Sequence, residues 1–286
     1  MEGMTDFDMP TLPLIDGYDL PQLGLGVYKL DPGETERVVR AAIELGYRHI
    51  DTASFYDNEE GVGRAINDAI KAGDVTREEL FITTKLWNSD QGNVFEAYQS
   101  SLSKLDLEFI DLYMIHWPWP ERGLFVESFE QMARLQGMGQ LQSLGVANFY
   151  EEVLDELIEK SGITPVVNQI ELHVGFTQDE LRKYHDSKKI VTEAWAPLAR
   201  GTMLNNPDVK AIAAKYEKTS AQVLLRFLLQ LGISVIPKTG SVERLEENLG
   251  ALSFRLSRDD MQVLASVQGE RLSNDPREFP GPVTSL

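Results

Sequence analysis

The feature that most constrains the fold of this sequence is a regular alternation of two kinds of segment. Short runs of β-branched and other apolar residues have the length and continuity of parallel strands that are covered on both faces. Longer runs between them place apolar residues at helical spacing, as Val38, Ala42 and Leu45 do. A strand followed by a helix, eight times over within 286 residues, predicts an α/β fold of the (β/α)8 or TIM-barrel type.

The pattern also gives approximate bounds for each element. The predicted strands are Gln22–Tyr28, His49–Ala53, Phe81–Leu86, Asp111–His116, Leu144–Asn148, Val166–Ile170, Val191–Trp195 and Ser234–Pro237. The predicted helices are Thr35–Leu45, Glu59–Lys71, Phe95–Leu105, Phe125–Met138, Glu152–Lys160, Gln178–Ser187, Ser220–Leu231 and Val242–Leu249. No linker or low-complexity segment divides the chain, so residues 1–286 are expected to form a single barrel domain.

Both ends of the chain carry additions to this pattern. Asp16 and Gly17 lie between two short apolar segments, and an Asp-Gly pair is typical of a two-residue hairpin turn. We expect this N-terminal β-hairpin to plug the bottom of the barrel. Near the other end, Ser257 followed by Asp259 and Asp260 predicts the N-cap and first turn of an extra C-terminal helix.

Composition limits the classes of function. The net charge of −18 makes nucleic acid an unsuitable partner, because an acidic surface repels it. No apolar run reaches the roughly 18 residues of a membrane span, and the acidic N-terminus has no apolar core of a signal peptide. The chain has no cysteine, which excludes disulfides and cysteine-based metal sites. We expect a cytoplasmic protein, and the lack of a long apolar surface helix favours a monomer.

Polar or aromatic residues end most of the predicted strands. In a barrel the carboxyl ends of all strands meet at one rim, where binding and catalytic groups gather. One such residue would be a solvated strand end, but a whole set at one rim indicates a functional site. These residues are Asp51, Lys85, His116, Asn148, Gln169, Trp195 and Lys238.

Three of these residues, with one tyrosine, form a sensible proton-transfer set. A lysine that is held by Asp51 stays charged, and its charge favours deprotonation of a nearby phenol. Tyr56 lies five residues after Asp51, and its phenol of pKa about 10 is a weak acid unless Lys85 lowers that value. His116 could donate a hydrogen bond to a carbonyl oxygen of the substrate and so fix its orientation. The set predicts a proton donor aimed at an oxygen that becomes negative during reaction.

Other interpretations of the same residues were weighed. Asp51 and His116, with His49 nearby, could ligate zinc, but no HExxH or cysteine-containing ligand set is present, so no metal is expected. Asp51 and Glu171 could serve glycoside hydrolysis, which would leave the lysines without a role. His173 and His185 are expected in loops or at the surface.

The sequence resembles the aldo-keto reductase superfamily in several ordered segments. GYRHIDTA at residues 46–53, with Tyr56, Glu59 and Gly63, is similar to the family's first signature. Lys85 before Leu-Trp and His116 before Trp stand where the family keeps a lysine and a histidine. IPKT at residues 236–239, with Arg244 and Glu247-Asn248, resembles the C-terminal cofactor signature. The resemblance covers nearly the whole chain, and it is strongest to prokaryotic 2,5-diketo-D-gluconate reductase-like members.

The resemblance implies a role for each matching residue. Tyr56 would be the general acid, Lys85 would lower its pKa, Asp51 would hold Lys85, and His116 would orient the substrate carbonyl. NADPH or NADP+ would be the cofactor. Asn148 and Gln169 would bind the nicotinamide carboxamide, Trp195 would stack on the ring, and Lys238, Thr239 and Arg244 would take the 2′-phosphate. The complete expected cofactor set is Val27, Asn148, Gln169, Trp195, Leu198, Lys238, Thr239, Arg244, Glu247 and Asn248.

The residues themselves agree with a phosphate site. Lys238 and Arg244 bracket a short turn that opens a helix, and helix N-terminal amides with a guanidinium suit a phosphate dianion. The competing interpretation is an exposed lysine and an arginine that pairs with Glu247. No GxGxxG fingerprint occurs, so a dinucleotide would be bound without a Rossmann fold.

The expected substrate site is aromatic. Tyr28, Phe55, Trp87 and Trp117 follow strand ends or enter rim loops, and a concave aromatic site favours small carbonyl compounds. The short C-terminal tail is expected to leave this pocket open. We therefore expect reduction of aldehydes and ketones, including keto sugars or 2-oxoaldehydes, to alcohols by direct hydride transfer. The alternative is a cofactor-binding regulatory or partner subunit with little turnover.

Overall fold

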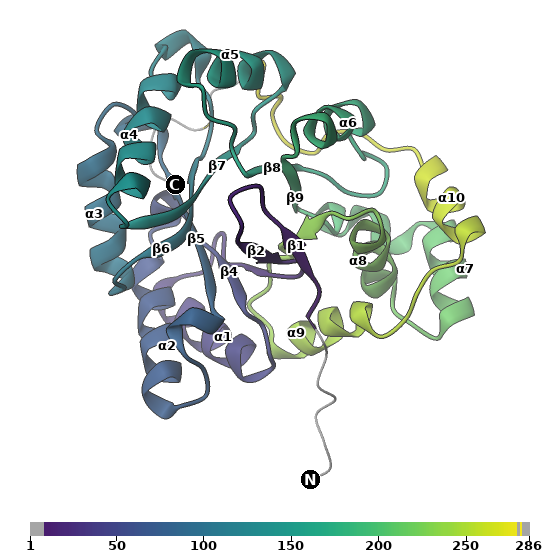
Figure 1. The fold of residues 1–286 in the computed structure, drawn as a ribbon. Coiled ribbons are helices and arrows are strands. Elements are labelled where there is room, and N and C mark those ends of the chain that lie inside the picture. The colour runs from purple at the N-terminus through teal and green to yellow at the C-terminus, as the bar shows by residue number, and fades with distance from the viewer. Residues whose placement is uncertain (1–8, 279–280, 282–286) are drawn as a thin grey trace.

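The chain folds around eight parallel strands. A computed structural model describes residues 9–278 and residue 281. The strands follow the order β10-β9-β8-β7-β6-β5-β4-β3, each parallel to its neighbours. Parallel bridges between Leu23 and Val235 and between Gly26 and Lys238 join the two ends, which closes the (β/α)8 barrel that the sequence predicts (Figure 1). The strands are β3 (Leu25–Gly26), β4 (His49–Asp51), β5 (Phe81–Leu86), β6 (Ile110–Ile115), β7 (Leu141–Ala147), β8 (Val167–Glu171), β9 (Val191–Trp195) and β10 (Ser234–Val235).

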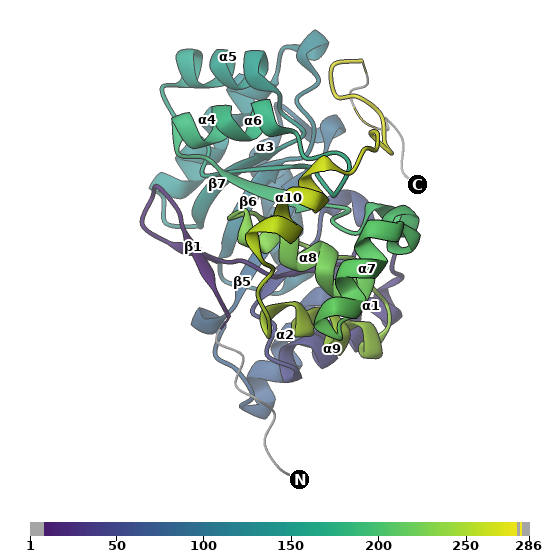
Figure 2. The same ribbon diagram turned by 90° about the vertical axis from the view of Figure 1, so that its right-hand side faces the viewer.

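Helices surround this barrel on the outside (Figures 1 and 2). All eight predicted helices are present within a few residues of their expected bounds. The sequence pattern missed α7, which Asn206 caps through hydrogen bonds from two backbone amides of its first turn. The helices are α1 (Pro32–Glu44), α2 (Glu59–Ala72), α3 (Val94–Leu105), α4 (Phe125–Gly137), α5 (Glu151–Ser161), α6 (Asp179–Lys188), α7 (Pro207–Tyr216), α8 (Ser220–Gln230), α9 (Val242–Leu249) and α10 (Arg258–Ser266).

Glycines let the first helices approach very closely. A Cβ on Gly61 of α2 would lie 2.3 Å from the carbonyl oxygen of Pro32 at the start of α1. A Cβ on Gly63 would lie 2.3 Å from the carbonyl oxygen of Leu105 at the end of α3. No real side chain fits at such distances, so α2 packs backbone against backbone on both neighbours.

The N-terminal hairpin covers the bottom of the barrel, as predicted. Strands β1 (Thr11–Pro13) and β2 (Asp19–Pro21) pair antiparallel across that end (Figure 1). The prediction of a two-residue turn is wrong, however. The amide of Leu14 donates to the carbonyl of Tyr18 at 2.8 Å, so three residues form the turn and only Gly17 among them has a positive φ, of 94°.

Apolar and polar contacts attach the hairpin to the barrel floor. Leu14 and Leu20 are buried in one cluster with strand residues that include Phe81, Leu112 and Val167. Ser143 donates a hydrogen bond of 2.7 Å to the carboxylate of Asp16. The bottom is therefore closed by apolar packing, which leaves the other rim as the place for a site.

The C-terminal additions also match the prediction. Ser257 caps α10, and its hydroxyl accepts from the amide of Asp260 at 3.2 Å. None of the helices in the described part of the chain has the length and apolar character needed to cross a membrane.

Candidate active site

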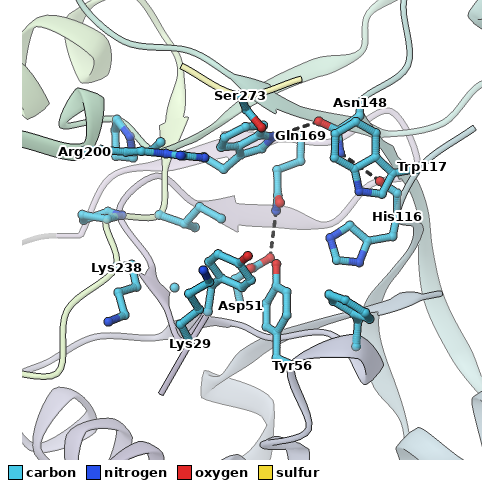
Figure 3. A pocket seen from close by; sticks show the side chains of 18 of the residues that line it. Lys29, Asp51, Tyr56, His116, Trp117, Asn148, Gln169, Arg200, Lys238 and Ser273 are labelled. Carbon is cyan, nitrogen blue, oxygen red and sulfur yellow. Dashed lines mark hydrogen bonds between the residues drawn. The ribbon is translucent and has the colours of Figure 1, made fainter. Parts of the chain in front are cut away.

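A cavity of about 570 Å³ opens at the carboxyl ends of the strands, at the rim opposite the hairpin (Figure 3). It brings together most of the residues that the sequence predicted from strand ends and rim loops. The predicted residues on its wall are Tyr28, Asp51, Phe55, Tyr56, Trp87, His116, Trp117, Asn148, Gln169, Trp195, Leu198 and Lys238.

Some predicted residues lie elsewhere. Lys85 is fully buried directly behind Asp51, and Val27 is buried in the apolar core. The remaining four belong to the turn before α9 and to α9 itself, away from the cavity wall; they are Thr239, Arg244, Glu247 and Asn248.

The floor of the cavity is a buried ion pair between neighbouring strands. The ammonium of Lys85 on β5 lies 2.7 and 2.8 Å from the two carboxylate oxygens of Asp51 on β4. Its remaining contact is with the carbonyl of Thr52, at 2.9 Å. Burial raises the pKa of Asp51, and the charge of Lys85 opposes that rise. A buried ammonium is stable only with such a full set of acceptors, so these two residues hold each other in place.

Tyr56 comes from a short 3₁₀ turn after β4. The hydroxyl of Ser54 in the same turn donates to the carbonyl of Lys85 at 2.9 Å, which ties the turn to β5. The Tyr56 ring centre lies 5.2 Å from the ammonium of Lys85 and 5.6 Å from the ring centre of His116. The phenol thus stands between Asp51 and His116 (Figure 3).

The prediction that Lys85 lowers the pKa of Tyr56 is wrong for the protein alone. Burial raises the pKa of this phenol well above 10, and the charge of Asp51 and the neighbouring Tyr28 act in the same direction. The depth at which the phenol is buried is the main cause of this rise. Tyr56 therefore carries its proton at every ordinary pH.

His116 is electrically neutral near pH 7. Burial lowers its pKa well below 6.5, and the charge of Lys85 lowers it further. Its ring packs edge-on against Trp87, with centres 5.1 Å apart. A neutral imidazole can donate one hydrogen bond without releasing a proton, which suits the orientation of a carbonyl oxygen.

Two amides and an indole form the wall above the ion pair. The amide nitrogen of Asn148 donates to the carbonyl of His116 at 2.9 Å, and its oxygen accepts from the indole of Trp195 at 3.0 Å. The amide nitrogen of Gln169 donates to Asp51 at 2.8 Å (Figure 3). The same nitrogen donates to Glu193 at 2.7 Å. Amide and flat aromatic groups side by side fit a planar ligand that carries its own amide.

The opposite wall is aromatic, as predicted. Phe55 stacks on Trp87 with ring centres 3.7 Å apart and an interplanar angle of 18°. Two residues of the C-terminal tail, Ser273 and Asn274, also line the cavity. The amide of Leu272 donates to the buried carboxylate of Glu171 at 2.6 Å, which holds the tail on the rim.

A cationic cluster lies at the start of α9. Lys238 and Arg244 are exposed, and neither forms an ion pair with any other residue that the structure describes. The expected alternative, pairing of Arg244 with Glu247, is therefore not seen. The hydroxyl of Thr239 accepts from the amide of Ser241 at 3.0 Å and stabilises the turn between the two cations. The two unpaired charges fit a phosphate.

Several site residues were missed by sequence reasoning. Lys29 and Arg200 lie three and five residues after the ends of β3 and β9, so a rule that selects the last residue of each strand does not reach them. Both have positive φ, of 58° and 50°, in the loops over the rim. His173 and His185, expected in loops or at the surface, are both fully buried. His173 does lie in the loop after β8, whereas His185 lies on α6. Among the described residues, no cluster of three or more histidine, aspartate or glutamate side chains could hold a metal ion. The complete set of cavity residues that were not predicted is Gly26, Lys29, Ala196, Pro197, Arg200, Ile236, Pro237, Ser273 and Asn274.

Comparison with known proteins gives consistent matches. The model of the Aldo/keto reductase family matches residues 21–268. An aldo-keto reductase of Mycolicibacterium smegmatis is 47% identical over 273 residues, which are 94% of this chain and 98% of that protein. The methylglyoxal reductase DkgA of Escherichia coli K12 is 45% identical over 273 residues, with the same two coverages. The structure of a Gox0644 mutant in complex with NADPH has a TM-score of 0.90 at 41% identity, and the match covers 95% of this chain and 98% of that one.

A closed barrel with a buried lysine–carboxylate pair, a phenol and a neutral histidine at one rim defines an oxidoreductase of the carbonyl-reducing kind. The chain belongs to the aldo/keto reductase family. The resemblance inferred from the separate sequence signatures is thereby confirmed.

Proposed function

We propose that this protein reduces aldehydes and ketones to alcohols with NADPH, with Tyr56 as the proton donor. One observation carries the proposal: Tyr56 and His116 face the same cavity above the Asp51–Lys85 pair. A protein that only binds a cofactor needs no such acid. The alternative of a regulatory subunit with little turnover is therefore the weaker one.

The site fits a nicotinamide dinucleotide phosphate. Trp195 offers a flat face beside the amides of Asn148 and Gln169, and the unpaired cations Lys238 and Arg244 suit the 2′-phosphate. When bound, NADPH supplies the hydride that adds to the carbonyl carbon. The residues of the chain provide the orientation and the proton.

The proton is transferred from the phenol to the substrate oxygen. His116 donates a hydrogen bond to the carbonyl oxygen and sets its direction toward Tyr56. As negative charge develops on that oxygen, the O–H bond of Tyr56 breaks and a new O–H bond forms on the product alcohol. The high pKa of Tyr56 keeps the donor protonated until then. The phenolate left behind lies near the ammonium of Lys85, which stabilises it.

Small reactive carbonyl compounds are the proposed substrates. The stacked rings of Phe55 and Trp87 give an apolar wall, and the tail residues Ser273 and Asn274 limit the cavity on another side. A 2-oxoaldehyde such as methylglyoxal and keto sugars fit this space, and the former agrees with the activity that names the E. coli relative. The cytoplasmic location and the monomeric state stay predictions.

The test is NADPH oxidation with methylglyoxal, an aromatic aldehyde and a diketo sugar acid. Tyr56→Phe should lower kcat by roughly 10²–10⁴-fold, the usual contribution of a positioned acid. NADPH binding, followed by tryptophan fluorescence, should not change. Tyr18→Phe is the matched control, because Tyr18 is exposed on the hairpin at the other end of the barrel. Full activity of Tyr56→Phe would reject the assignment, and an inactive wild type that still binds NADPH would favour the regulatory alternative.

A further inference from the structure

Glu193 is a buried carboxyl group that the proposed mechanism does not use. It lies on β9 with no exposed surface. In the strand register it stands beside Gln169 on β8 and beside Ser234 on β10, so the three side chains share one level of the barrel interior. A buried carboxyl group costs stability unless its neighbours compensate for the lost contact with water. The hydrogen bonds of Glu193 therefore indicate its role in the site.

Glu193 and Asp51 together accept both protons of the Gln169 side-chain amide. Gln169 has two N–H groups on its side-chain nitrogen, and that nitrogen donates to Oδ2 of Asp51 at 2.8 Å and to Oε1 of Glu193 at 2.7 Å. The other oxygen of Glu193 accepts from the hydroxyl of Ser234 at 2.8 Å. The reverse orientation of Gln169 would place its oxygen against two carboxyl groups. Glu193 and Asp51 together thus hold the nitrogen of this amide and leave its oxygen for the cavity.

The amide oxygen of Gln169, Oε1, remains free to accept a hydrogen bond. No described residue donates to its Oε1, and Gln169 lines the cavity. Beside it, the amide nitrogen of Asn148 uses one N–H on the carbonyl of His116 and keeps the second. The wall therefore offers one acceptor and one donor side by side, which is the complement of a primary carboxamide.

Burial favours the neutral form of Glu193. Burial raises the pKa of Glu193, while the hydrogen bonds from Gln169 and Ser234 and the charge of Lys85 oppose the rise. The ring of His49 lies 3.7 Å away, and burial lowers the pKa of His49 to about 4. A protonated carboxyl keeps one oxygen that can accept from Gln169, so the positioning contact does not require a charge.

We propose that Glu193 is a positioning residue that holds Gln169 with Oε1 toward the cavity, and so makes the site select a carboxamide over a carboxylate. The proposal rests on the proposed function of Gln169 at the nicotinamide. A carboxylate in place of the carboxamide has no N–H to donate to Oε1 of Gln169. Two acceptor oxygens would then lie against each other. The class of ligand selected is a nicotinamide dinucleotide, and the class rejected is its nicotinic acid counterpart.

The test compares three ligands by calorimetry or tryptophan fluorescence: NADP+, its nicotinic acid analogue, and the 2′-phosphate of ADP-ribose, which lacks the ring. Wild type should bind NADP+ more tightly than the other two. Glu193→Leu should raise the Kd of NADP+ about tenfold, as expected for one lost buried hydrogen bond, and should reduce the preference for amide over acid. Its Kd for the ring-less ligand should not change, which a general structural defect could not produce.

Conservative variants separate positioning from folding. Glu193→Gln keeps an oxygen for Gln169 and should retain the wild-type preference. Glu193→Asp keeps a carboxyl group but moves it away from Gln169, because the side chain is one methylene shorter. It should reduce the preference for amide over acid even if Glu193→Leu does not fold. Glu59→Leu removes another buried acid, whose contact is Thr84 at 2.6 Å on the outer side of the barrel wall, and should leave the preference unchanged.

Each outcome decides between the explanations. Equal weakening of all three ligands in Glu193→Leu, an unchanged preference in Glu193→Asp, or a loss in Glu193→Gln as large as that in Glu193→Leu would overturn the proposal. If wild type binds NADP+ no better than the ring-less ligand, the function proposed for Gln169 fails instead, whatever the variants do.

Discussion

Replacement of Lys85 by methionine tests the buried ion pair most directly. Methionine is close to lysine in length, so the change removes the ammonium with little change in volume. Asp51, only 2% exposed, would keep its hydrogen bond from Gln169 but lose both short contacts to the ammonium. The carbonyl of Thr52 would also lose its donor. The variant therefore isolates the cost of a carboxylate that is buried without its counter-charge.

The expected loss is large and depends on pH. Breaking a buried pair from one side costs about 3–5 kcal/mol of unfolding free energy near neutral pH. Burial raises the pKa of Asp51, and Lys85 is the first group that opposes the rise, so the pKa is higher still in the variant. A carboxyl with a raised folded pKa loses stability as pH rises from its unfolded value to its folded one. The deficit of Lys85→Met should thus grow by up to about 1.4 kcal/mol per pH unit above pH 5.

Urea unfolding of wild type and variant at pH 5, 6, 7 and 8 measures this deficit. Lys160→Met is the control, because Lys160 has a 61% exposed side chain in a surface pair, and should cost no more than about 0.5 kcal/mol at any pH. Adding Asp51→Asn to Lys85→Met should recover most of the loss. A deficit that is constant from pH 5 to 8, or a double variant no more stable than Lys85→Met, would refute the reasoning.

Three further predictions concern other parts of the chain. Gly63→Ala would place a Cβ 2.3 Å from the carbonyl of Leu105 and should lower the unfolding free energy by about 2 kcal/mol, whereas Gly137→Ala, with no atom within 4 Å, should not lower the Tm. Burial lowers the pKa of His185 to about 3, so the neutral imidazole contributes to the free energy of unfolding above pH 6.5, and this contribution is lost as pH falls. Between pH 7 and 4, His185→Gln should therefore lose about 3 kcal/mol less unfolding free energy than wild type, and identical losses in the two proteins would contradict this. Arg244→Ala should reduce the preference for NADPH over NADH by roughly 10–100-fold in steady-state assays, and an unchanged ratio would reject the phosphate assignment.

The barrel could be predicted from sequence because its elements have a clear period. The strands and helices from residue 49 to residue 231 fall close to their predicted positions, except for α7, which was not predicted. The strands at the seam are the exception, since β3 and β10 have two residues each where longer runs were expected. Pro237 has no N–H to extend the ladder, and the seam is completed by isolated bridges, which local pattern does not reveal.

The site was predictable where a strand end delivers a polar residue, as for Asp51, Lys85 and His116. It was not predictable where the decisive contact joins distant segments. Glu193 looks like one more charged residue in the sequence, and only its contact with Gln169 from another strand gives it a role. The pKa of Tyr56 was predicted in the wrong direction because sequence does not show how deeply a phenol is buried.

The seam between β3 and β10 also has a consequence for how the chain is made. The two strands that close the barrel are separated by about 200 residues, so at a synthesis rate of roughly 5–20 residues per second the first strand waits about 10–40 s for its partner on the ribosome. Until then Leu25–Gly26 has an unpaired edge, and the tail residues that line the cavity emerge later still. The nascent chain therefore passes through an open-edged stage in which aggregation competes with closure, and its cavity is completed only after Ser273 and Asn274 have left the ribosome.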